Sequence, residues 1–117
     1  MDKLELAWAA GFFDGEGYAR LRTTQRPNGK YRHAVLAVAQ IDIRPLERFQ
    51  NAVLGLGKIN GPYGPYPSQT KNSSPQYRWE TAKFEHVQAV VALLWNFLSE
   101  PKKEQILKSI PLKKRRD

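Results

Sequence analysis

The stretch that decides the fold is residues 7–17, which read AWAAGFFDGEG. Apolar spacing predicts a helix over residues 3–14, with Gly15 ending it in the C-cap position. Spacings of three and four residues place one set of short side chains on a single helix face: Ala7, Ala10, Gly11 and Asp14. The bulky side chains of Leu4, Trp8 and Phe12 occupy another face.

A face of small residues lets a second helix approach closely, because side chains set the distance between packed helices. The sequence contains no other segment of this kind. We therefore expect this face to pack against the same helix of a second copy, about a two-fold axis. Packing against an internal neighbour is the alternative that the pattern leaves open.

Two acids, Asp14 and Glu16, flank Gly15 at the predicted C-terminal end of this helix. The helix dipole is already negative at that end, so two carboxylates there need compensation. A divalent cation bound by carboxylate oxygens would provide it. The alternative is a pair of solvated turn residues, since turns often carry such side chains.

Composition narrows the partners and the chemistry. A chain of 117 residues with 41% hydrophobic residues is expected to form one domain, which we place at residues 1–110, with a basic tail over residues 111–117. The absence of cysteine excludes disulfides and thiolate chemistry. The net charge of +8 and the pI of about 9.9 favour a polyanionic partner, either nucleic acid or an anionic membrane surface.

No stretch approaches the roughly 20 apolar residues that span a bilayer, and no leader is recognisable. We expect an intracellular protein that is not secreted and has no membrane partner. The choice between a bacterial or phage cytoplasm and an organelle stays open.

Apolar periodicity predicts the remaining elements in the order αββαββα, with an extra short C-terminal helix, in an α+β domain. Strands are expected over residues 18–26 and 31–42, joined by a turn at residues 27–30 that exploits Asn28-Gly29. Asp42 is expected to cap a helix with Leu46, Phe49 and Val53 on its apolar face. Short strands near residues 58–60 and 76–82, a helix over 83–99 and a helix opened by Pro101 complete the prediction.

The first strand predicts a nucleic-acid surface, because alternation places a row of polar side chains on one face: Tyr18, Arg20, Arg22, Thr24 and Arg26. Arginine binds guanine edges or phosphates bidentately. On the other strands Arg32, Gln40 and Arg78 are further candidates for DNA contact. On the second strand, the side carrying Val35, Ala37 and Ala39 is expected to face the core. A sheet with one ordinary solvent-exposed face is the alternative.

Residues 9–17 resemble the LAGLIDADG motif of homing endonucleases. The resemblance extends over nearly the whole chain, through the order of elements, the Leu54-Gly55-Leu56-Gly57 step and the stretch Leu98 to Gln105. It implies the LAGLIDADG endonuclease fold, with a saddle-shaped antiparallel sheet that contacts double-stranded DNA in the major groove. It also implies that the motif helices form a homodimer interface.

The resemblance further implies that Glu16 binds Mg²⁺ at the cut site, at a position where the family usually has Asp. Mn²⁺ is expected to substitute, and Ca²⁺ to support binding without cleavage. Asp14 would help to end and position the helix. Lys102 would stabilise developing charge or help to activate water, and Gln40 resembles a strand glutamine that contacts DNA.

The predicted function is therefore a homing endonuclease, associated with the mobility of an intron or intein, that cuts both strands of a long, nearly palindromic DNA site. The alternative is a catalytically inactive protein of the same fold, either a DNA-binding regulator or an RNA-binding intron-splicing factor. RNA is a partner only under that alternative.

Overall fold

The computed structural model describes residues 2–64 and 74–111. Its elements follow the predicted order, and the bounds are α1 (Lys3–Glu16), β1 (Gly17–Arg26), β2 (Gly29–Gln40), α2 (Ile43–Ala52), β3 (Lys58–Tyr63), β4 (Gln76–Thr81), α3 (Phe84–Leu94), the 3₁₀ helix η1 (Trp95–Phe97) and α4 (Glu100–Ser109). The predicted α+β class and the additional C-terminal helix are confirmed.

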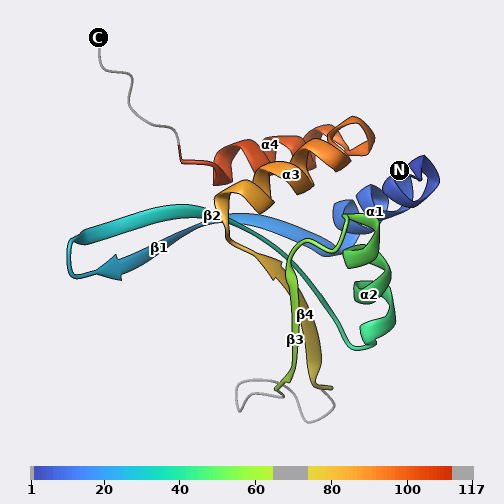
Figure 1. The fold of residues 1–117 in the computed structure, drawn as a ribbon, viewed down its shortest axis with the longest axis horizontal. Coiled ribbons are helices and arrows are strands. Elements are labelled where there is room, and N and C mark those ends of the chain that lie inside the picture. The colour runs from blue at the N-terminus through green and yellow to red at the C-terminus, as the bar shows by residue number, and fades with distance from the viewer. Residues whose placement is uncertain (1, 65–73, 112–117) are drawn as a thin grey trace.

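The strands form one four-stranded antiparallel sheet in the order β1-β2-β4-β3, so β1 and β3 are its edges. The sheet twists strongly, and the β1–β2 hairpin and the β3–β4 pair project in different directions (Figure 1). One continuous core contains residues from α1, α2, α3, α4 and the sheet, so the helices pack on the same face. We call the other face of the sheet the open face.

The centre of the core is aromatic. Trp79 on β4 is fully buried and meets Phe49 of α2 edge-on, with ring centroids 4.7 Å apart. Phe13 of α1 also stacks on Phe49, with ring centroids 6.2 Å apart. These contacts join α1, α2 and β4, which fixes the end of α1 against the sheet.

The prediction for the core side of β2 was wrong. Ala34, Leu36 and Val38 belong to the core beneath the helices, as shown by the pairing of Leu36 with the buried Ala19 of β1. Val35 and Ala37 are also buried, but they pair with Arg20 and Tyr18 and so lie on the open face. Small apolar residues on both faces removed the alternation on which the prediction rested.

Helix α1 begins at Lys3 as predicted, but it ends two residues later than predicted. Asp2 caps its N-terminus by accepting from Leu4 N at 2.9 Å and Glu5 N at 3.3 Å. The helix passes through Gly15 and ends at Glu16, and the Gly17 N–H donates to the carbonyl of Phe13. Gly15 is therefore the penultimate helical residue, and Glu16 sits at the junction of α1 with β1.

The later helices match their predicted positions with one difference. Asp42 caps α2 as predicted, and Leu46, Phe49 and Val53 are fully buried. The helix predicted over residues 83–99 is α-helical only as far as Leu94, and the chain then continues as the 3₁₀ helix η1. Its apolar face includes the buried Val90, whereas Phe84 is 61% exposed.

The β1–β2 hairpin is tighter than predicted. Arg26 pairs with Gly29, so the loop consists of Pro27 and Asn28. Gly29 has a φ of +128°, a value that glycine adopts readily because it lacks a Cβ. The hairpin extends past the helices, and no residue between Arg22 and His33 is buried.

Residues 65–73, which lie between the predicted strands near 58–60 and 76–82, and the predicted basic tail from residue 112 onward lie outside the described residues. Within residues 2–64 and 74–111, no helix combines the length and apolar character needed to cross a membrane.

Candidate active centre and nucleic-acid interface

The candidate active centre lies where α1 runs into β1. Glu16, the last residue of α1, is exposed, and its carboxylate accepts a hydrogen bond from Gln40 Nε2 at 3.2 Å. Gln40 is the last residue of β2, and antiparallel pairing brings that end of β2 beside the start of β1. The fold thus joins the predicted metal ligand to a predicted DNA-contacting glutamine.

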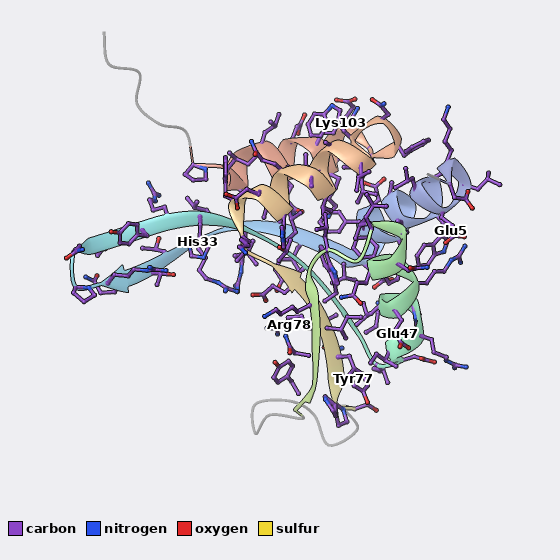
Figure 2. All side chains as sticks on the ribbon, viewed as in Figure 1. Glu5, His33, Glu47, Tyr77, Arg78 and Lys103 are labelled. Atoms are coloured by element: carbon purple, nitrogen blue, oxygen red, sulfur yellow. The ribbon has the colours of Figure 1, made fainter. Side chains whose placement is uncertain are left out.

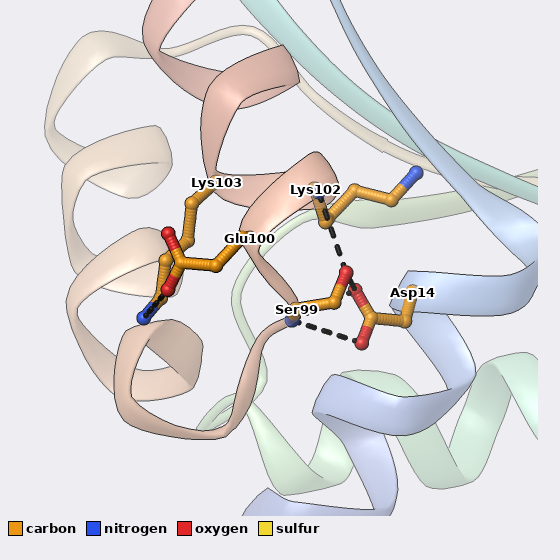
Figure 3. A network of polar contacts seen from close by, with 5 residues as sticks. All are labelled: Asp14, Ser99, Glu100, Lys102 and Lys103. Atoms are coloured by element: carbon orange, nitrogen blue, oxygen red, sulfur yellow. Dashed lines mark hydrogen bonds and ion pairs between the residues drawn. The ribbon is translucent and has the colours of Figure 1, made fainter.

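Asp14, the first acid of the pair, has a different environment. Its carboxylate accepts from the Ser99 backbone N–H at 3.1 Å and from the Ser99 hydroxyl at 2.9 Å. Ser99 is the N-cap of α4, and its Oγ accepts from Lys102 N at 3.4 Å (Figure 3). We call this set the Asp14–Ser99 contact; it fastens the C-terminal end of α1 to the N-terminal end of α4.

Lys102 reaches the same junction from α4. Its ammonium donates to the carbonyl of Gly17 at 2.8 Å and to Gln105 Oε1 at 3.0 Å, and it lies 5.4 Å from the ring centroid of Phe13. Burial removes water from the ammonium and lowers the pKa of Lys102, while the nearby Asp14 carboxylate opposes that change. Lys102 therefore sits against the residue that follows Glu16.

The open face carries the predicted row of β1 side chains. The β1–β2 register is continuous from Gly17 to Arg26, so the alternation holds throughout the strand. The guanidinium of Arg20 lies 5.6 Å from the ring of Tyr18, and that of Arg26 lies 5.2 Å from the ring of Tyr31 on β2. Arg20 and Arg26 are exposed, which leaves their donors available to an anionic partner.

A second group of polar side chains on the open face comes from β3 and β4. Glu80 lies between two arginines, 3.2 Å from Arg22 and 4.0 Å from Arg78. Arg78 projects into the angle between the hairpin and the β3–β4 pair (Figure 2). A hollow of about 430 Å³ is bounded by these three side chains and by Lys58, Asn60, Tyr63 and Ala82.

Arg32 and Gln40, two predicted DNA contacts, do not lie on the open face. Arg32 pairs with Thr23, so it projects from the opposite face to Arg22, and its predicted place on the same surface was wrong. Gln40 lies two residues after the core residue Val38, so its side chain belongs to the helix-covered face of the sheet. There it donates a hydrogen bond to Glu16.

Several residues of the site escaped the sequence reasoning. Lys58 and Asn60 pair opposite Glu80 and Arg78, and their alternation in β3 was visible in the sequence. Ser99 precedes Pro101 at the spacing of a helix N-cap, which is a recognisable signal. Gln105 belongs to the stretch that resembles the family, but its contact with Ala19 could not be predicted because it depends on the placement of α4 beside β1.

The predicted faces of α1 need two corrections, which concern Ala10 and Leu4. Ala10 is fully buried in the chain's own core, so it has no surface to offer a second copy. Gly11 and Gly15 are exposed, and a Cβ built on either one meets no atom within 4 Å. Leu4, which was predicted to lie with Trp8 and Phe12, is 82% exposed and lies two turns before Gly11 on the same side of the helix. The open stripe of α1 thus runs through Leu4, Gly11 and Gly15, with Ala7 and Asp14 partly exposed.

The candidate active centre at the α1–β1 junction contains few carboxylate groups that could bind a metal ion. Among residues 2–64 and 74–111, no three His, Asp or Glu side chains gather closely enough to hold an ion. Glu16 nevertheless presents an exposed carboxylate, the hard oxygen donor that Mg²⁺ prefers, and Mg²⁺ sites often use one or two carboxylates together with substrate phosphates and water. The residues present therefore fit Mg²⁺ as one part of its coordination shell.

No protein-family model matches this chain. Solved structures do match it. The homing endonuclease I-CvuI, in complex with a DNA target, superposes with a TM-score of 0.70 and 18% identity over 90% of this chain and 63% of that one. The archaeal intron-encoded homing endonuclease I-Vdi141I, complexed with DNA, has a TM-score of 0.69 and 15% identity over 92% of this chain and 66% of that one.

A third homing endonuclease, I-TnaI, has a TM-score of 0.65 and 21% identity over 85% of this chain and 64% of that one. The LAGLIDADG endonuclease I-GzeII, also complexed with DNA, matches with a TM-score of 0.66 and 16% identity over 84% of this chain and 31% of that one. The chain has the LAGLIDADG homing endonuclease fold, which confirms the fold implied by residues 9–17. It spans less than two thirds of the length of each of these structures.

Proposed function

We propose that this chain is a Mg²⁺-dependent DNA endonuclease of the homing type that acts as a homodimer. The observation that carries the proposal is the junction of α1 with β1. There the exposed carboxylate of Glu16 lies beside Gln40, and the Lys102 ammonium is held on the carbonyl of the next residue, Gly17. The strand that starts at this junction carries the arginine row of the open face. A catalytic centre and a polyanion-binding surface are thereby continuous.

The open face would bind duplex DNA through Tyr18, Arg20, Arg22, Thr24, Arg26 and Arg78. A two-stranded ribbon such as the β1–β2 hairpin fits the major groove sterically. Exposed arginines would contact phosphates and thereby position the duplex, and those that reach base edges would select sequence. The complexes of I-CvuI and I-Vdi141I with DNA support this assignment to the fold.

Glu16 would hold the divalent cation, with further oxygen ligands from DNA phosphates, water and the second copy. I-CvuI has been crystallised with DNA in the presence of Mg and of Ca, which supports the use of divalent cations by proteins of this fold. When bound, Mg²⁺ supplies Lewis-acid stabilisation of phosphate charge. Gln40 would orient the Glu16 carboxylate, since its amide N–H already donates to it.

Lys102 would stabilise negative charge that develops on the scissile phosphate. Its ammonium has three N–H donors, and two of them are directed to Gly17 O and Gln105 Oε1. The remaining donor is free of partners among the described residues. A cation held in place before the reaction stabilises developing charge without having to reorganise.

Homodimerisation would double this centre. A copy related by a two-fold axis along the open stripe of α1 would bring a second Glu16 near the first, with one acid for each DNA strand. An isologous dimer recognises related half-sites, so the target would be nearly palindromic.

The test is cleavage of a randomised duplex DNA library in Mg²⁺, followed by sequencing of the cut ends, with Glu16→Gln treated in parallel. Wild-type protein should give nearly palindromic cut sites. Glu16→Gln should lose cleavage while its Kd for the selected duplex stays within about threefold. Enrichment of bound DNA without any cut ends would overturn the nuclease and favour a DNA-binding regulator. Retained cleavage by Glu16→Gln would overturn the assignment of the metal ligand.

A further inference from the structure

The contacts of Gln105 reveal a role that the motif does not supply. Helix α4 packs along β1, which is an edge strand. In an antiparallel pair, alternate N–H groups of an edge strand point away from the partner strand. The Ala19 N–H is one of these, and it donates to Gln105 Oε1 at 3.1 Å. Gln105 therefore docks α4 on the edge of the strand.

The same oxygen also accepts from Lys102 Nζ at 3.0 Å. Lys102 and Gln105 lie three residues apart on α4, a spacing that places them on one helix face. A lysine side chain is long and flexible, and its terminal ammonium adopts a fixed position when several acceptors surround it. Here the acceptors are Gln105 Oε1 and Gly17 O, which belong to different elements.

We propose that Gln105 is a positioning residue that holds the Lys102 ammonium at the junction of α1 with β1. Its side-chain oxygen accepts from both the β1 backbone and the ammonium, so together with the carbonyl of Gly17 it sets the position of Lys102 relative to the strand that follows Glu16. This inference rests on the proposed endonuclease function for its kinetic consequence. The positioning itself is a property of the free protein.

The kinetic experiment is a double-mutant cycle between Gln105→Leu and Lys102→Met, measured by single-turnover cleavage of a selected duplex. Gln105→Leu should slow cleavage about tenfold or more, since misplacing a reacting group by about 1 Å costs up to about 100-fold. Its Kd for DNA should change less than about threefold. In the Lys102→Met background, Gln105→Leu should have no further effect, because the group that it positions is gone.

Two matched variants separate positioning from a general effect on structure. Gln105→Glu keeps an oxygen acceptor for both donors and should restore the cleavage rate to within about threefold of wild type. Gln88→Leu makes the same exchange at an exposed position on α3 and should leave the rate unchanged. A loss caused by Gln105→Leu that is equal in the Lys102 and Lys102→Met backgrounds would overturn the proposal.

A measurement on the free protein keeps the proposal testable without cleavage. The Lys102 ammonium should give a resolved, slowly exchanging ¹⁵Nζ resonance that disappears in Gln105→Leu and persists in Gln88→Leu. If wild-type protein cuts no DNA, the endonuclease proposal fails while this resonance still decides the role of Gln105. If the resonance is the same in Gln105→Leu and wild type, the positioning role is wrong whatever the nuclease result.

Discussion

Gly55 and Gly57 follow α2 with similar backbone conformations, at φ values of +79° and +83°, but their surroundings differ. A Cβ on Gly55 would meet no atom within 4 Å. A Cβ on Gly57 would collide with the indole ring of Trp79, which is fully buried and donates from Nε1 to the Leu56 carbonyl at 2.9 Å. The glycine at position 57 is therefore required by packing as well as by φ.

This pair gives a prediction for stability. Gly55→Ala should lower the free energy of unfolding by about 1 kcal/mol, the cost of a left-handed conformation for a residue with a Cβ. Gly57→Ala adds overpacking against a ring that cannot move aside, and should cost about 3 kcal/mol in all. Urea denaturation of the two variants measures both values. Equal losses would show that Trp79 yields to the added methyl group.

Among the elements, α1 and α4 depend on each other through the Asp14–Ser99 contact. The two residues are 85 positions apart in sequence, yet Ser99 both caps α4 and donates twice to the Asp14 carboxylate. The first turn of α4 contains Lys102, so this contact also determines where the lysine begins its path to β1.

Loss of this contact should loosen the start of α4. Asp14→Ala should raise amide hydrogen-exchange rates at Lys102 and Lys103 about tenfold, and Ser99→Ala should cost about 1 kcal/mol, a typical value for an N-cap. Asp2→Ala is the control, because it removes an N-cap of similar geometry from α1. It should accelerate exchange at Leu4 and Glu5 and leave α4 unchanged. Unaltered protection of α4 in Asp14→Ala would contradict the coupling.

The elements also show what the sequence could predict. Strong local signals, such as the Asp42 cap with the stripe through Leu46, Phe49 and Val53, were confirmed. The end of α1 was misplaced, because a glycine inside a helix and a glycine beyond its end look alike until the next strand is positioned. The core side of β2 could not be read from a run of small apolar residues that is buried on both faces.

The candidate site divides in the same way. The row of arginines on β1 could be predicted because side chains alternate between faces every two residues along a strand. The register confirms that these residues share a face. Arg32 was misassigned because its face depends on the pairing across the hairpin. The contacts that join Asp14 to Ser99 and Gln105 to Ala19 connect residues that are 85 and 86 positions apart in sequence. Local patterns of residue spacing do not predict contacts over such separations.

At the scale of the whole molecule, the open face presents a group of basic side chains to a polyanionic partner. The net charge is +8, and the open face carries the β1 arginines together with Lys58 and Arg78. Binding to DNA should therefore weaken steeply with salt, because each neutralised phosphate releases counterions.

Replacing a phosphate-contacting arginine should lower that salt dependence. Each of Arg20→Gln and Arg26→Gln should reduce the slope of log K against log salt concentration by about 0.9, the value for one phosphate contact with duplex DNA. Lys108→Gln, at an exposed position on α4, removes the same charge from the helical side and should leave the slope unchanged. Fluorescence anisotropy over a salt series measures all three. An equal decrease for Lys108→Gln would mean that net charge, and not the open face, governs binding.

The β1–β2 hairpin has an evolutionary consequence. No residue from Arg22 to His33 is buried, so the outer part of the hairpin, which carries Arg22, Thr24 and Arg26 of the open face, contributes no residue to the core. Mutations in residues 22–33 change the charge and hydrogen-bonding groups on the open face, while the apolar core that stabilises the domain stays intact. Under the proposed function, lineages of this protein would acquire new recognition sequences through changes in the hairpin, while the fold and the α1–β1 junction are inherited unchanged.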